Sequence, residues 1–150
     1  MIKVQQEAFD TGEEIKKLTA NRTDIGAVVS FTGLVRDFND GSAIQSLTLE
    51  HYPGMTEKEL ETIESQARDK WDLQDCLVVH RYGKMELAEP IVLVVTASAH
   101  RQDAFNAAQF LMDWLKTKAP FWKLEADQSG TSGWVKERKS DLDAAQRWED

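Results

Sequence analysis

The sequence has little of several features that mark particular classes of protein. It holds one cysteine, Cys76, in 150 residues, which excludes an internal disulfide and fits a reducing, cytoplasmic setting. The longest aliphatic run, residues 91–95, is far too short to span a bilayer, and the first residues are too polar for a secretory signal. The chain carries 18 Lys and Arg against 26 Asp and Glu, a formal net charge of -8. Because nonspecific nucleic-acid binding depends on basic surface, this acidic balance argues against it.

Common catalytic signatures are missing as well. The sequence contains no glycine-rich phosphate loop, paired-cysteine zinc site or nucleophile elbow. Its three prolines, Pro53, Pro90 and Pro120, each fall at a break between patterned segments, and no repeat or linker-like tract divides the chain. We therefore expect a single domain over residues 1–150, with no metal site.

Strand and helix patterns are mixed along the chain. Asp10 predicts the cap of a short helix, Thr56-x-x-Glu59 predicts a capping box for a second, and a third helix begins at Arg101. Alternating or continuous apolar residues predict strands over residues 26–32, 44–52, 76–82 and 91–97. The last of these is apolar enough to be buried on both faces. The mixture fits an α+β or α/β protein, and we assign the chain to the α+β class.

The remaining segments read as connections. Residues 37–42 are turn-rich and predict a loop, residues 83–90 predict a loop or a short bridge, and residues 134–135 predict a last short strand. The polar stretch from Ser140 favours fraying, and Trp148 offers an anchor for it.

The most informative stretch is Lys116-Thr-Lys-Ala-Pro-Phe-Trp-Lys123. A helix cannot run through Pro120, so Lys116 falls in the last helical turn and Lys123 on an extended segment beyond the break. Cations gathered at one rigid corner of an acidic protein indicate a local anion site. On spacing alone, an equally good interpretation is that Lys116 and Lys118 complement the dipole at the helix C-terminus.

Two further basic clusters sit at strand ends. Ser98-Ala-His100-Arg101 occupies a strand-to-helix junction, where free N–H groups attract anions, although His100 as a local cap and Arg101 as a solvated residue fit too. In Phe31-Thr-Gly-Leu-Val-Arg36, the glycine allows a bend and Arg36 projects from the strand end. Taken alone, Arg36 is better explained as a surface arginine.

Three other reactive side chains read as structural. His51 and His80 lie in strand patterns and are interpreted as satisfied structural histidines. Cys76 also lies in a strand and reads as a small buried apolar residue, not a nucleophile.

Taken together, the motifs resemble the large, catalytic subunit of molybdopterin synthase. The resemblance rests on the three clusters above, on Leu47-Thr-Leu-Glu-His-Tyr-Pro-Gly-Met55, and on Lys116-x-x-Ala-Pro-Phe-Trp-Lys-x-Glu125. It extends from about the first helix to Trp148, and the last motif is the most specific. The sequence departs from the pattern at Leu34, where a basic residue can occur, and at Leu124.

The resemblance implies an α/β hammerhead-type fold with mixed and antiparallel sheets and a homodimer core. It also implies a small ubiquitin-like sulfur carrier on each subunit, giving a heterotetramer. The implied reaction converts cyclic pyranopterin monophosphate (precursor Z) to molybdopterin by inserting two dithiolene sulfurs. These sulfurs come from the thiocarboxylate at the carrier's C-terminal Gly-Gly, and no cofactor or metal is required.

The resemblance also implies roles for individual residues. Lys116 and Lys123 fall on its catalytic lysines. The residues expected to contact the substrate are Arg36, His100, Arg101, Glu125, Arg138, Leu34, Val35 and Leu124. The sequence leaves open the order of the two sulfur transfers, whether Lys116 acts covalently or by proton transfer, the identity of the carrier, and whether the pocket is shared across the dimer. A noncatalytic phosphate-ligand binding or assembly module is the alternative function.

Overall fold

The computed structural model describes residues 1–39, 42–119, 121–127, 132–135 and 139–148, with the backbone alone at residues 38–39, 42–45, 122–127, 132–135 and 139–141. In chain order the elements are β1 (Ile2–Gln5), α1 (Thr11–Thr19), β2 (Ala27–Leu34), β3 (Phe38–Asn39), β4 (Ser42–His51), α2 (Met55–Lys70), β5 (Leu73–Arg81), β6 (Gly83–Glu86), β7 (Pro90–Ser98), α3 (Arg101–Thr117), β8 (Phe121–Asp127), β9 (Ser132–Val135) and α4 (Lys139–Gln146). Among the described helices, none is both long enough and apolar enough to cross a membrane.

A four-stranded sheet in the order β1-β5-β7-β2 forms the centre of the molecule. β7 pairs in antiparallel fashion with β5 and with β2, whereas β1 joins β5 in parallel, so the sheet is mixed. Residues 92–98 of β7 are all buried, which confirms the prediction of a strand covered on both faces. β1 and β2 form the two edges.

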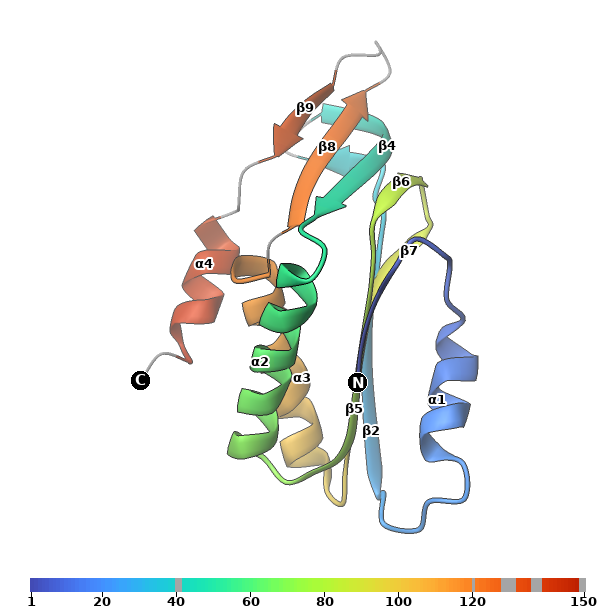
Figure 1. Cartoon of the computed structure of the whole chain (residues 1–150), viewed down its shortest axis with the longest axis vertical. Helices are drawn as coiled ribbons and strands as arrows, with labels where there is room; N and C mark the ends of the chain where they lie inside the picture. Colours follow the sequence, from blue (N-terminus) through green and yellow to red (C-terminus); the bar gives the residue numbers. More distant parts are fainter. Residues whose placement is uncertain (40–41, 120, 128–131, 136–138, 149–150) are drawn as a thin grey trace.

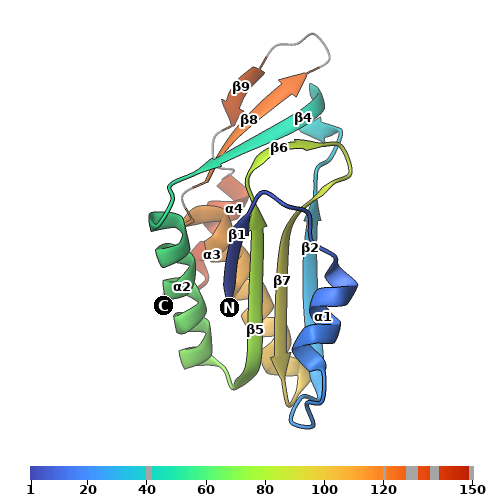
Figure 2. The ribbon, with the colours of Figure 1, turned by 45° about the vertical axis from the view of Figure 1, so that its right-hand side comes forward.

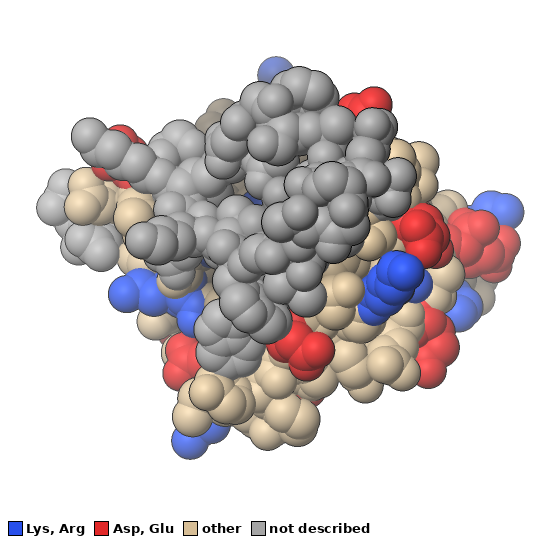
Figure 3. All heavy atoms as spheres, turned by 90° about the horizontal axis from the view of Figure 1, so that it is seen from above, with Lys and Arg blue, Asp and Glu red and all other residues tan. Residues whose placement is uncertain are grey.

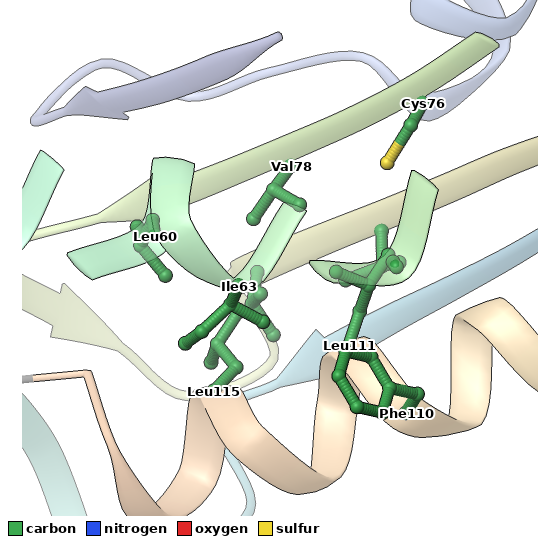
Figure 4. Packing of buried hydrophobic residues seen from close by; sticks show 10 residues of the cluster. Leu60, Ile63, Cys76, Val78, Phe110, Leu111 and Leu115 are labelled. Carbon is green, nitrogen blue, oxygen red and sulfur yellow. The ribbon is translucent and has the colours of Figure 1, made fainter. Parts of the chain in front are cut away.

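Helices cover both faces of this sheet. α2 and α3 lie on one face and α1 on the other (Figures 1 and 2). Because side chains alternate along a strand, β5 and β7 supply both layers. The core under α2 and α3 contains Leu60, Ile63, Cys76, Val78, Val92, Val94, Phe110, Leu111 and Leu115 (Figure 4). The core under α1 contains Leu77, Val79, Leu93 and Val95.

A second sheet lies at one end of the first (Figure 1). Its strands run in the order β3-β4-β8-β9, and β6 pairs with β4. Leu47 and Leu49 of β4 are buried with Val35 and Met85, whereas Glu50 is exposed, so the alternation predicted for this strand is confirmed. The mixed sheet, the second antiparallel sheet and the packed helices confirm the α+β class.

The two turn-rich segments hold more structure than predicted. A loop is predicted at residues 37–42, where the structure has β3, and a loop or a short bridge at residues 83–90, where the structure has β6. β6 pairs in antiparallel fashion with β4, and its Met85 is completely buried. A strand with one buried apolar residue shows no alternation in the sequence, which explains why it reads as a loop.

One helix cap is confirmed and one is wrong. Asp10 caps α1, because its Oδ1 accepts a hydrogen bond from the Glu13 N–H at 2.9 Å. The box Thr56-x-x-Glu59 is incorrect: α2 begins at Met55, and Glu57 accepts from the N–H of the capping Gly54 at 2.6 Å. Gly54 has φ of +86°, a left-handed conformation that glycine adopts readily, and this turn starts the helix early.

The chain end is a helix, not a frayed tail. α4 begins at Lys139 and includes Ser140, and Trp148 anchors it as predicted. The Trp148 Nε1–H donates to Asp113 Oδ2 at 2.6 Å, and the indole centroid lies 5.6 Å from those of Trp71 and Phe110 in edge-on contacts. One aromatic side chain therefore ties the C-terminal segment to α3 and to the core.

This attachment predicts a graded loss of stability in two substitutions. Trp148→Ala removes the ring and the hydrogen bond and should lower the free energy of unfolding by about 3 kcal/mol. Trp148→Phe retains most edge-on contact and loses only the N–H donor, so we expect a loss of about 1 kcal/mol. Urea unfolding followed by circular dichroism measures both. A change within about 0.5 kcal/mol for Trp148→Ala, the range typical of surface sites, would show that α4 is not anchored in this way.

Candidate active site

Lys116 stands on the last turn of α3. The helix forms because Ala104, Ala108, Leu111 and Leu115 make one buried stripe, and it ends at Thr117 with Lys118 as its C-cap. Lys116 lies off this stripe and its side chain is exposed. The position in the last helical turn is therefore confirmed.

The neighbouring lysine makes a different contact. Lys118 Nζ lies 5.2 Å from the centroid of the Trp114 ring, and the Lys118 N–H donates to Trp114 O at 2.7 Å. Lys118 is therefore used in closing the helix. Both lysines are exposed at the C-terminal end of α3, so the dipole interpretation fits each of them, and Lys118 has the Trp114 ring as an additional contact.

The segment after the helix turns sharply into the second sheet. The Phe121 N–H donates to Ala119 O at 2.9 Å, and both residues pack against the core under α2 and α3. Pro120 lies outside the described residues. β8 then begins at Phe121, so the extended segment predicted beyond the break is confirmed.

Three predicted site residues lie on β8, where the structure describes the backbone. Lys123 pairs with Leu49 of β4 and Val135 of β9, and Glu125 pairs with Leu47 and Gly133. Leu124 lies between them. β8 is thus a central strand of the second sheet, which gives these positions a fixed backbone. Arg138, the remaining predicted contact, lies outside the described residues.

The Arg36 cluster lies at the other edge of the same end of the molecule. Val35 is 4% exposed and its backbone is held by Glu89 and Ala88, so its side chain belongs to the core. Leu34 is 54% exposed, and Arg36 is exposed just beyond it. The predicted bend is present, because the pairing of β2 with β7 shifts register between Gly33 and Leu34.

His100 and Arg101 lie at the opposite end. His100 occupies the N-cap position of α3 without a capping hydrogen bond from its side chain, and both residues are exposed. Arg101 and Lys116 are fifteen residues apart on α3, which at a rise of about 1.5 Å per residue separates them by about 22 Å. Within one chain the structure does not bring these two clusters together.

The surface around the second sheet is mixed in charge. Seen from that end, the Lys and Arg side chains of the described residues are interspersed with Asp and Glu (Figure 3). Among the described residues, this end of the molecule therefore shows single cations beside carboxylates and no broad basic face. The described residues also include no group of three His, Cys, Asp or Glu that could hold a metal ion.

Cys76 is an inert thiol. It is completely buried in the core under α2 and α3, as the sequence predicts (Figure 4). Burial, together with the nearby Glu64 carboxylate, raises the pKa of the Cys76 thiol to about 12. At neutral pH the sulfur is protonated and shielded, so it is unsuited to carry out a nucleophilic step.

Both strand histidines are partnered, as predicted. His80 is buried and its Nδ1 lies 2.9 Å from Arg81 O, and His51 Nε2 lies 3.8 Å from Glu57 Oε1. Sequence reasoning missed a contact with the segment of residues 116–123, which we call the lysine corner: the His80 ring stacks on the ring of Phe121. No local sequence pattern predicts this contact, because it joins residues from β5 and β8.

Comparison with known proteins identifies close relatives over the full length. Residues 4–118 match the family model described as MoaE protein. The molybdopterin synthase catalytic subunit of Pseudomonas aeruginosa is 55% identical over 149 residues, which cover 99% of each protein. A solved structure, the molybdopterin biosynthesis MoaE protein of Burkholderia ambifaria, is 43% identical and covers 100% of this chain and 98% of that one, with a TM-score of 0.84.

A third similar protein was solved in a complex. Its structure is described as the protein–protein complex of subunits 1 and 2 of the molybdopterin-converting factor from Helicobacter pylori. The matched chain is 25% identical, with a TM-score of 0.75, and the match covers 91% of both chains.

Proposed function

The chain belongs to the MoaE family of molybdopterin synthase catalytic subunits, and on that premise we propose how it converts precursor Z to molybdopterin. Two sulfurs enter the pterin side chain as a dithiolene, each donated by a thiocarboxylate at the C-terminus of a small carrier protein. The observation that carries this proposal is the placement of Lys116, exposed on the last turn of α3 where the chain turns into β8. Lys123 lies on the strand that follows.

The chemistry requires cations at this corner. The substrate phosphate and the carrier's thiocarboxylate are both negative, and two like charges about 4 Å apart repel by roughly 4 kcal/mol at an effective dielectric constant of 20. Lys116 offsets that repulsion and serves the sulfur transfer itself, for which its amine suits either proton transfer or a covalent adduct. Lys123 assists and seats the carboxyl end of the carrier.

The substrate's phosphate and pterin are held by the other predicted residues. Arg36 provides a planar guanidinium fork for phosphate at the same end of the molecule as Lys116. Neighbouring contacts come from Leu34, Leu124, Glu125 and Arg138, whereas the predicted contact Val35 is buried in the core and supports this segment from below. Cys76 takes no part, because its thiol is buried and protonated.

Sulfur must therefore come from outside the chain. A related protein has been solved with a second subunit of the molybdopterin-converting factor, which supports a carrier subunit here. We expect a ubiquitin-like carrier whose Gly-Gly tail reaches Lys116 and Lys123. Glycines suit a narrow approach because they have no side chains to exclude.

The two remaining predicted contacts, His100 and Arg101, reach the site from a second copy of the chain. β2 is an edge strand of eight residues without a single charge, and its Val28, Phe31 and Leu34 are 36%, 42% and 54% exposed. Proteins usually protect such an edge with charge, proline or a partner. Pairing of two copies along β2 therefore supports the homodimer, which with two carriers makes a heterotetramer.

Twofold pairing also explains the separation of the clusters. The start of β2 lies against the segment before α3: the Gly26 N–H donates to Ser98 O at 3.0 Å, and a Cβ on Gly26 would meet Ala99 O at 2.2 Å. Two β2 strands related by a twofold axis run antiparallel, so the end of one lies beside the start of the other. Arg36 of one copy then faces His100 and Arg101 of the second.

Substitution of Lys116 separates an enzyme from the alternative, a noncatalytic phosphate-ligand binding module. Lys116→Ala should lose nearly all turnover of precursor Z with thiocarboxylated carrier, and Lys116→Arg should be almost as impaired because arginine keeps the charge but not the proton chemistry. Lys118 is exposed and lies two residues after Lys116. Lys118→Ala is therefore the matched control and should retain turnover. Dithiolene product is measured, with carrier binding followed by calorimetry. Near-normal turnover in Lys116→Ala would refute the assignment.

Mixed dimers test whether the site is shared. Lys116→Ala and Arg101→Ala should each be strongly impaired as homodimers. In a random mixture of the two, half of the dimers are mixed and each has one intact site, so about a quarter of wild-type activity should return. If each site lay within one chain, every site would carry a defect and mixing would restore nothing.

A further inference from the structure

Four aromatic side chains form a column where the two sheets meet. The ring of Phe121, the first residue of β8, is stacked on that of His80 from β5, with centroids 3.7 Å apart and planes 17° apart. On β4, the His51 ring lies 6.4 Å from that of Phe121 and 4.1 Å from that of Tyr82. The column therefore contains one side chain from the strand that carries Lys123.

The His80 ring is held firmly in the larger sheet. The side chain is buried, and its Nδ1 lies 2.9 Å from Arg81 O. Because a carbonyl oxygen only accepts, Nδ1 carries the hydrogen and donates it. The Arg81 guanidinium is buried in turn, and it donates to Gln6 O at 3.0 Å and Pro90 O at 2.9 Å. His80 thus offers a ring of fixed orientation at the end of β5.

Phe121 is the part of the lysine corner that this ring holds. It stands between Lys116 and Lys123 in the sequence, and its backbone pairs with that of His51 at the end of β4. The covalent link between α3 and β8 is only residues 118–120. Pairing with β4 holds β8 along its length, and the packing of Phe121 fixes how its first residue lies against the end of α3.

We propose that His80 is a positioning residue for the lysine pair, acting by stacking on Phe121 and so setting how the start of β8 lies against the end of α3. The inference rests on the proposed function, because it takes Lys116 and Lys123 as the reacting amines. Catalytic groups must be held within about half an ångström of their working geometry. A buried stacked ring restricts the corner in a way that three connecting residues do not.

Two substitutions at His80 separate the ring from its hydrogen bond. His80→Asn keeps an amide N–H near the position of Nδ1 but removes the ring, whereas His80→Phe keeps the ring and removes the donor. For His80→Asn we expect kcat to fall about 100-fold, the effect of misplacing a reacting group by about 1 Å, with KM changed less than about threefold. For His80→Phe we expect kcat within about threefold of wild type. Phe121→Leu, which keeps a partly buried apolar side chain without a ring, should repeat the loss.

The control is Leu77→Ala, a substitution on the same strand that faces the core under α1. It should lower the unfolding midpoint as much as His80→Asn does while leaving kcat unchanged. The inference is overturned if His80→Asn retains wild-type kcat, if His80→Phe is as impaired as His80→Asn, or if Leu77→Ala loses kcat equally. Lys116→Ala is assayed alongside, because full turnover in that variant would refute the proposed function whatever the result at His80.

Discussion

The structure depends on burying both faces of the β5–β7 strand pair. Alternate side chains of these strands pack into one core under α2 and α3 and into another under α1. Fixing β7 between two layers fixes the point where α3 starts, at the end of β7, and α3 then runs back along the sheet to the opposite end (Figure 2). The position of Lys116 is a consequence of this packing, since it is set by the length of a helix that lies along a buried strand.

The same arrangement distributes the cations. A helix of 17 residues places its first and last turns far apart, so one chain presents Arg101 at one end and Lys116 at the other. The edge strand β2, which has no charged residue, runs from one of these ends of the molecule to the other. The homodimer proposed above resolves both features at once, because antiparallel pairing of β2 covers the edge and places the cations of one copy beside the lysine corner of the other.

Several elements could be predicted because their signals are local. The continuous apolar run of β7 and the Asp10 cap of α1 can each be recognised from a few consecutive residues. α2 is predicted correctly in outline, but its N-cap is Gly54, two residues before the Thr56 that the capping box suggests. β6 and α4 were missed because their stability comes from partners distant in sequence, such as the contact of Trp148 with Asp113.

The site divides in the same way. The motif around Lys116 was visible in the sequence because a helix end, a proline and two lysines lie together. The contact between His80 and Phe121 was not, because it joins β5 and β8, two strands that are distant in sequence. The separation of Arg101 from Lys116 also required the structure. The sequence shows that both clusters are present, but it does not show whether they meet within one copy of the chain or between two copies.

A crystal structure of the dimer with precursor Z bound tests the central claim most directly. The account predicts that the substrate phosphate lies within hydrogen-bonding distance of Arg36 of one copy and of His100 or Arg101 of the other, with Lys116 of the first copy facing the pterin side chain. A phosphate bound only by residues of a single copy, or a substrate lying away from Lys116, would contradict it.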